Sequence, residues 1–96
     1  MENRFTWDDE DAYWRTNYLN RPYASGRDYT FYQPAYRYGY EAANRYQGRD
    51  WNDVESDLSR DWSTYEHSGS STWEQIKDAV RDAWNRVTGN RPVGAR

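Results

Sequence analysis

Cysteine is absent from this 96-residue chain, and histidine occurs once, at His67. Without cysteine the chain forms no disulfide and has no thiolate chemistry. A zinc site would lack its usual ligands, so we expect no metal and no cofactor, and we interpret His67 as a solvated loop residue. No apolar run is long enough to span a bilayer, and no signal-peptide pattern opens the sequence. We therefore expect a soluble cytoplasmic protein with no membrane partner.

Aliphatic side chains are also scarce, with two leucines, one isoleucine and four valines, against six tryptophans, ten tyrosines and two phenylalanines. A core built from this chain must be aromatic, and each ring can bury roughly 150–250 Å². The length suits one domain with a modest core. We expect residues 1–89 to form a single helical domain, with the order of residues 1–33 less strongly indicated, and residues 90–96 to form a flexible tail.

Large aromatic residues recur at a constant step of eleven positions: Trp7, Tyr18, Tyr29, Tyr40, Trp51, Trp62, Trp73 and Trp84. Together they define four units of 22 residues, with large side chains at offsets 0, 3, 7 and 11 in most units. These offsets fall on one stripe of an α-helix, because eleven residues make almost three turns. The pattern predicts an all-α fold of four short helices, arranged as two similar helical hairpins with a 22-residue internal repeat and an aromatic core.

The residues that precede the four units are good helix N-caps: Thr6, Asp28, Asp50 and Thr72. Pro34 interrupts the second unit, because an interior proline removes a backbone hydrogen bond and clashes with the preceding turn. We therefore expect the second helix to begin at Pro34, and the helices to lie near 7–19, 34–46, 51–66 and 73–88. Gly39 within the second helix indicates either a close approach by another backbone or ring, or a tolerated glycine.

Catalytic motifs are missing from the sequence. It contains no phosphate-binding glycine loop and no nucleophile elbow. Two pairs of carboxylates at helical i, i+4 spacing, Asp57 with Asp61 and Asp78 with Asp82, could hold a hard cation, but such faces are more often solvated or salt-bridged. We therefore expect that the protein is not an enzyme.

Arginine supplies twelve of the thirteen basic residues. Arginine stacks on rings and forks onto carboxylates, so it could bridge the two within the fold, for example through the helical pairs Arg37–Glu41, Asp78–Arg81 and Asp82–Arg86. It could also form a binding surface with the nearby tyrosines. The rings in residues 29–40 point to more than one side of a helix and cannot all face one small core, so we expect an exposed aromatic patch there. The candidate binding residues are Tyr36, Arg37, Tyr38, Tyr40, Arg45 and Arg49.

Two partners suit this binding surface. The first is another protein chain, most simply a second copy, because tyrosine and arginine are favoured at the energetic centres of interfaces. The second is nucleic acid, through stacking on residues 36–49, although the net charge of −3 opposes phosphate binding. A third and weaker hypothesis is a small-ligand or carbohydrate site built from tryptophan and aspartate.

The segments 34–40, 51–58 and 73–84 carry a resemblance. With their surroundings, roughly residues 30–86, they resemble small bacterial proteins associated with the general stress response, a group whose biochemistry is not established. The resemblance implies a stress context, and it assigns no activity and no functional residue. The leading hypothesis is therefore a non-enzymatic protein-interaction or self-assembly module, and the alternative is a nucleic-acid-binding protein.

Overall fold

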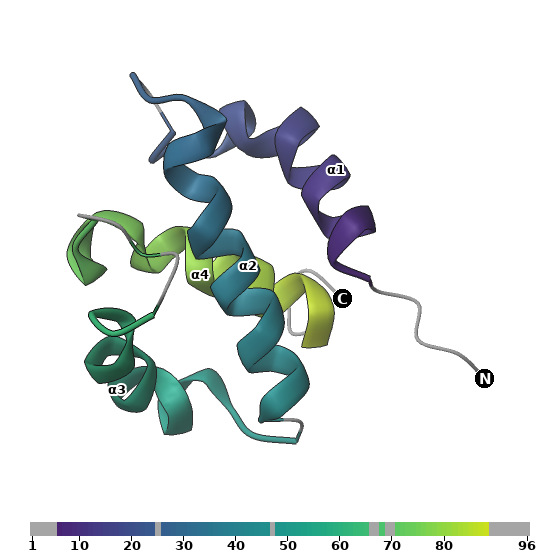
Figure 1. Cartoon of the computed structure of the whole chain (residues 1–96). Coiled ribbons are helices and arrows are strands. Elements are labelled where there is room, and N and C mark those ends of the chain that lie inside the picture. The colour runs from purple at the N-terminus through teal and green to yellow at the C-terminus, as the bar shows by residue number, and fades with distance from the viewer. Residues whose placement is uncertain (1–5, 25, 47, 66–67, 69–70, 89–96) are drawn as a thin grey trace.

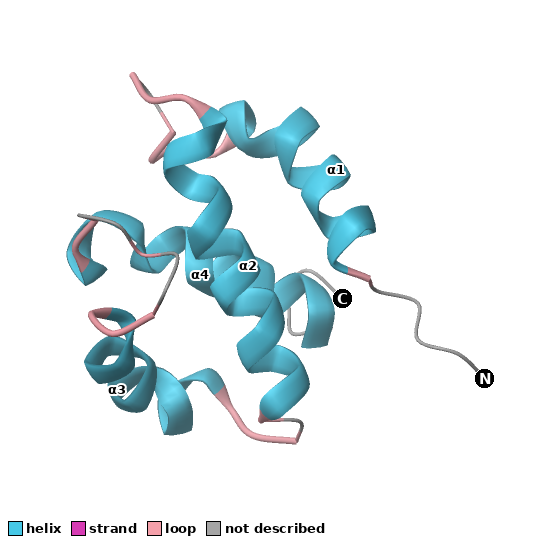
Figure 2. Cartoon of the chain, viewed as in Figure 1, coloured by secondary structure: helices cyan, strands magenta, loops and turns pink. Residues whose placement is uncertain are grey.

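Helices account for the regular structure of the chain, as the prediction of an all-α fold required (Figures 1 and 2). The computed structural model describes residues 6–24, 26–46, 48–65, 68 and 71–88. Within these residues there is no strand, and the elements are α1 (Trp7–Asn17), the short 3₁₀ turn η1 (Tyr18–Asn20), α2 (Tyr29–Arg45), α3 (Trp51–Trp62) and α4 (Trp73–Thr88). The predicted tail at 90–96 and the loop residue His67 lie outside the described residues.

Each α-helix begins at the aromatic residue that opens a 22-residue unit, namely Trp7, Tyr29, Trp51 and Trp73. The predicted helix starts at 7, 51 and 73 are confirmed. The predicted ends at 19 and 66 are too late, because α1 ends at Asn17 and α3 ends at Trp62. The 22-residue internal repeat itself stays a prediction.

The predicted start of the second helix at Pro34 is wrong, because α2 begins five residues earlier and contains Pro34 in its interior. The proline leaves the Thr30 carbonyl without its helical donor, but Thr30 is exposed, so this carbonyl can bind water. The helical turn before Pro34 also buries Tyr29 and Tyr32 to 6% and 2% exposure. Burial of these two rings outweighs the local cost of the proline.

The most extensive helix contact joins α2 to α4, which α2 crosses in Figure 1. Gly39 lies at the crossing. A Cβ at this position would lie 2.2 Å from the backbone oxygen of Val80 and 2.9 Å from the Cβ of Ala83. The first interpretation of Gly39 is therefore correct: another backbone packs against it. Other small buried residues on the two helices also permit the close approach: Ala35, Ala42, Ala43, Ala79 and Ala83.

The remaining helices surround this central pair. Helix α1 packs on α2, α3 packs lightly on α4, and bulky rings fill the space between them. The core residues expected in the second half of the chain form part of one connected cluster: Trp51, Leu58, Trp62, Val80 and Trp84 are buried, with Trp73 partly buried against them. No described helix combines the length and apolar character that crossing a membrane requires.

Side-chain capping occurs at fewer helix starts than the sequence indicates. The Thr6 hydroxyl accepts the Asp9 backbone N–H at 3.2 Å, and the Gln75 side chain accepts the Thr72 backbone N–H at 3.0 Å, which is one half of a capping box. Asp28 and Asp50 occupy the N-cap positions of α2 and α3 without a side-chain hydrogen bond. The prediction of such bonds is wrong at these two positions, where both side chains are exposed and water competes.

Candidate interaction site

Two carboxylates, the buried Glu10 and the partly buried Asp82, tie α1 and its following loop to α4. Glu10 is 1% exposed and accepts hydrogen bonds from Arg86 Nε at 3.0 and 3.2 Å. Asp82 accepts Arg21 Nε at 2.7 Å. Both pairs join residues that are more than sixty positions apart, so spacing along one helix could not have indicated them. The predicted helical pair of Arg37 with Glu41 is confirmed at 3.1 Å.

Arginine also lies over aromatic rings throughout the described residues. The closest case places the Arg86 guanidinium 3.6 Å from the ring centroid of Tyr13. Other guanidinium groups cover rings on neighbouring turns or helices: Arg15 over Tyr29, Arg27 over Phe31, Arg37 over Trp7, Arg45 over Tyr46 and Arg81 over Trp51. Much of the arginine therefore bridges rings and carboxylates within the fold, as the first interpretation of its abundance proposed.

Two of the candidate binding residues lie in the core instead of on a surface. Tyr36 is fully buried and stacks on Trp14 with ring centroids 4.3 Å apart, and Tyr38 is 7% exposed. Tyr40 is half-buried beside Trp7, and Arg37 pairs with Glu41. The folded chain therefore offers none of the Tyr36 ring to a partner, and of Tyr38 only the small part that lines a pocket.

The exposed aromatic patch expected at residues 29–40 does not form. Among the described residues, the large hydrophobic side chains that remain exposed are Tyr13 and Leu19, and both lie outside that segment. The expectation assumed that rings on opposite sides of one helix cannot all be buried. Helix α2 is central, with α1, α3 and α4 around it, so its rings are buried against different neighbours.

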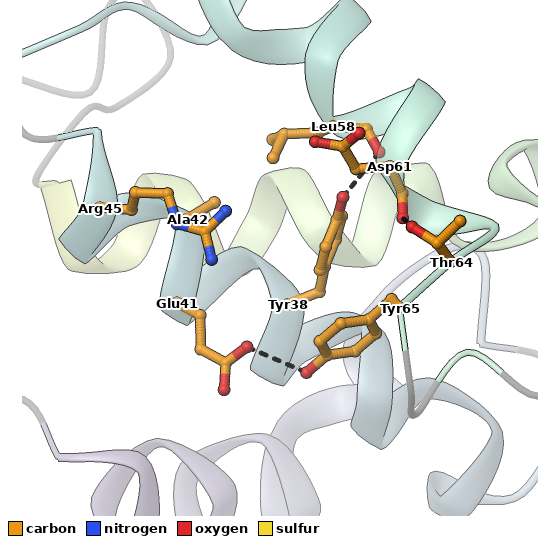
Figure 3. A pocket seen from close by; sticks show the side chains of 8 residues that line it. All are labelled: Tyr38, Glu41, Ala42, Arg45, Leu58, Asp61, Thr64 and Tyr65. Carbon is orange, nitrogen blue, oxygen red and sulfur yellow. Dashed lines mark hydrogen bonds between the residues drawn. The ribbon is translucent and has the colours of Figure 1, made fainter.

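A pocket of about 250 Å³ lies between α2 and α3 (Figure 3). The Tyr38 hydroxyl donates to the Leu58 backbone oxygen at 2.7 Å, and the Tyr65 hydroxyl donates to Glu41 Oε1 at 3.1 Å. Burial raises the pKa of Tyr38, with the negative charge of Asp61 adding to the effect, so the phenol stays protonated. The full lining is Tyr38, Glu41, Ala42, Arg45, Leu58, Asp61, Thr64 and Tyr65.

Charges of both signs stand at the rim of this pocket. Arg45 is exposed and has no carboxylate within ion-pair distance among the residues that the structure describes. Asp61 meets Arg60 Nε through Oδ1 at 3.3 Å, and its side chain is 47% exposed. The candidate residues Tyr38 and Arg45 thus meet in one site, whereas Arg49 is exposed outside the pocket lining.

Helix α3 supplies a part of the site that sequence reasoning did not assign to it. Leu58, Asp61 and the following Tyr65 join α2 here. The sequence indicates a role for Asp61 only through its i, i+4 spacing from Asp57, which is compatible with binding of a hard cation. Nothing in the sequence indicated that the end of α3 would lie beside the second half of α2.

Three of the four carboxylates at i, i+4 spacing, Asp57, Asp61 and Asp82, bind arginine in this fold. Asp57 accepts Arg60 Nη1 at 3.2 Å, and Asp82 accepts Arg21. Within the described part of the chain, no group of three or more histidine, cysteine, aspartate or glutamate residues is placed to hold a metal ion. These carboxylates therefore act as partners of arginine in the structure.

Comparison with known proteins gives no match: no family model, no curated protein and no solved structure resembles the chain closely enough to be matched. The resemblance to bacterial stress-response proteins therefore rests on the sequence segments alone. The proposals about function below therefore follow from the folded structure.

Replacing Glu10 by glutamine is expected to flatten the pH dependence of stability. Burial raises the pKa of Glu10 above 4.5, although Arg86 opposes the shift. At the Glu10 carboxyl the folded chain then binds a proton more tightly than the unfolded chain. The stability that results is fully present below pH 4.5 and is lost as the pH rises through the raised pKa. Urea unfolding of the wild type and of Glu10→Gln, from pH 4.5 up to neutral pH, measures the difference.

Asp11 is the matched control for this measurement, because its pKa is shifted in the opposite direction and stability therefore changes with pH in the opposite sense. Partial burial opposes its ionisation, but hydrogen bonds from Tyr29, Gln33 and Arg15 prevail and lower its pKa below 3.8. The stability that the ionised Asp11 contributes is therefore lost as the pH falls through the lowered pKa. Asp11→Asn should leave the slope above pH 4.5 unchanged. Parallel curves for the wild type and Glu10→Gln would contradict this account of Glu10.

Proposed function

We propose that the chain is a non-enzymatic self-assembly module in a bacterial stress response, and that the face around the α2–α3 pocket joins two copies. The observation that carries the proposal is the pocket rim, where Arg45 has no carboxylate partner among the described residues and the Asp61 side chain is 47% exposed. The stress context rests on the sequence resemblance alone.

The pocket rim is self-complementary. A two-fold axis through this face would bring Arg45 of one copy to Asp61 of the other, and the same contact would form a second time. Opposite charges placed in this way fix the orientation of two surfaces and favour their encounter. The aromatic floor supports such a contact, since hydrogen bonds hold Tyr38 and Tyr65 in place and little side-chain freedom is lost on association.

The contacts of three carboxylates support a non-enzymatic role. Glu10, Asp11 and Asp82 each bind donors from another part of the fold. Carboxylates engaged in this way hold helices together. Among the described residues, no histidine or serine lines the pocket between α2 and α3.

Charge reversal tests this face directly. Arg45→Glu alone and Asp61→Arg alone each place like charges opposite one another, so each should weaken association about tenfold or more, which is 1.4 kcal/mol. The double variant restores opposite charges and should recover most of the loss. Sedimentation equilibrium of each variant measures the effect.

The control for charge reversal is Glu74→Arg, on α4, where the side chain is 78% exposed and makes only a local contact with Lys77. It should associate like the wild type. Equal association by all four variants would remove the α2–α3 face from the proposal.

Nucleic acid remains the alternative partner, through the exposed Arg45 and Arg49. Base stacking would need accessible rings beside these cations, whereas Tyr36 and Tyr38 are buried. Binding of single-stranded RNA or DNA that weakens steeply with added salt would favour this alternative over self-assembly.

A further inference from the structure

Two tyrosines and one aspartate form a hydrogen-bonded chain between the loop after η1, α2 and α4. The Tyr23 hydroxyl donates to Asp82 Oδ2 at 2.5 Å, and the hydroxyl oxygens of Tyr23 and Tyr36 lie 3.0 Å apart. A phenol has one proton to donate. Because Tyr23 gives its proton to Asp82, Tyr36 must be the donor to Tyr23, and the chain runs from Tyr36 through Tyr23 to the carboxylate.

A path of touching rings leads from the surface to this chain. Tyr13 is the exposed aromatic ring among the described residues, and its centroid lies 4.9 Å from that of Trp14 in an edge-on contact. Trp14 in turn stacks on Tyr36 at 4.3 Å, with an angle of 6° between the ring planes. An electron vacancy created at Tyr13 therefore has a continuous route of rings in van der Waals contact to the hydroxyl chain.

We infer that Tyr23 is the residue at which one-electron oxidants, such as organic peroxyl radicals, oxidise this protein. The oxidant gains one electron, takes up a proton from water and becomes a hydroperoxide, and the water that gave the proton remains as hydroxide. Tyr23 loses that electron, and its O–H proton passes along the existing hydrogen bond to Asp82 Oδ2. The products on the protein are a neutral phenoxyl radical at Tyr23 and a protonated Asp82.

The geometry explains why the proton and the electron leave Tyr23 together. Burial, together with the hydrogen bond to Asp82, raises the pKa of Tyr23, so the phenol does not ionise first. An oxidised phenol is a strong acid, so a carboxylate already in hydrogen-bond contact makes the loss of the electron easier. With no cysteine and one methionine in the chain, aromatic rings are its main oxidisable side chains.

Other tyrosine–carboxylate pairs are less suited to this reaction. The Tyr29 hydroxyl donates to Asp11 Oδ1 at 2.7 Å, but Asp11 also accepts from Gln33 and Arg15, and its lowered pKa makes it a weaker base. The Tyr65 bond to Glu41 is longer, at 3.1 Å. Tyr23 has the shortest of the three bonds.

Arg21 opposes the proton transfer, because its Nε also donates to Asp82 Oδ2, at 2.7 Å, and its Nη2 donates to Asp82 Oδ1, at 3.2 Å. Both bonds, and the attraction of the guanidinium charge, would be weakened by a proton on the carboxylate. The Arg21 side chain is 41% exposed, so it can turn into water once Asp82 is neutral. Removing the Arg21 charge should therefore increase radical formation at Tyr23.

Flash photolysis of the full chain with a photo-oxidised ruthenium tris-bipyridine complex tests the inference, with the phenoxyl radical followed by transient absorption and electron paramagnetic resonance. Tyr23→Phe should reduce the yield of long-lived phenoxyl radical several-fold. Asp82→Asn keeps an acceptor for the hydrogen bond but cannot take the proton, and should cause a similar loss. Arg21→Gln should raise the yield.

Tyr29→Phe is the matched control, since it removes a tyrosine that is also bonded to a carboxylate. It should leave the yield close to that of the wild type. Radical formation in the wild type should slow in heavy water, a readout that needs no variant to fold. Equal yields in Tyr23→Phe and Tyr29→Phe, or a wild-type rate unchanged in heavy water, would overturn the inference.

Discussion

Gly39→Ala is expected to destabilise the fold by about 3 kcal/mol, the upper end of the range for overpacking in a core. The added Cβ would lie 2.2 Å from the Val80 backbone oxygen, and a backbone atom cannot rotate away as a side chain can. Helices α2 and α4 would have to separate at their closest contact. Alanine gains at most about 1 kcal/mol of helix propensity over glycine, which is too little to compensate.

Urea unfolding of Gly39→Ala measures this effect. Thr30→Ala on the same helix is the control, because Thr30 is exposed and such substitutions usually change stability by within about 0.5 kcal/mol. If Gly39→Ala unfolded at the same urea concentration as the control, the close contact of α2 with α4 would be wrong.

Trp84→Ala is expected to cost about 3–5 kcal/mol, as truncation of a large buried side chain usually does. Trp84 is fully buried on α4, and its ring meets that of Trp51 edge-on at 5.9 Å. A chain of this size has a total stability of about 5–15 kcal/mol, so the variant should be partly or wholly unfolded at physiological temperature.

Thermal unfolding, followed by near-ultraviolet circular dichroism, reports the loss of Trp84. Leu19→Ala is the matched control, because Leu19 is the most exposed large hydrophobic residue described, at 69%. It should change stability by less than about 0.5 kcal/mol. Equal effects of the two substitutions would contradict the position of Trp84 in the core.

Local signals in the sequence predicted the helices well where they agreed with one another. An aromatic stripe and an N-cap residue type coincide at Trp7, Trp51 and Trp73, and helices begin there. At Tyr29 the same two signals conflict with Pro34, and the helix nevertheless begins at Tyr29 and contains the proline. The early start of α2 is explained by the burial of Tyr29 against α1. This is a tertiary contact, which helix propensity and capping do not predict.

The candidate site was predictable only in part, since it depends on which helices become neighbours. Residue type and spacing predict Tyr38 and Arg45 in the site, where both lie, but they predict Tyr36 on the same surface, and Tyr36 lies in the core. Spacing also gave the pair of Arg37 with Glu41, whereas the partners of Glu10 and Asp82 come from distant segments. Gly39 was the one position where a local cost indicated a tertiary contact.

Sedimentation equilibrium of the wild-type chain over a wide range of protein concentration tests the central claim, that this is a self-assembly module joined through the α2–α3 face. The proposal predicts a mass that rises from 11.6 kDa toward twice that value with increasing concentration, and that stays lower in Arg45→Glu under the same conditions. A wild-type mass that remains at 11.6 kDa at every concentration would contradict it.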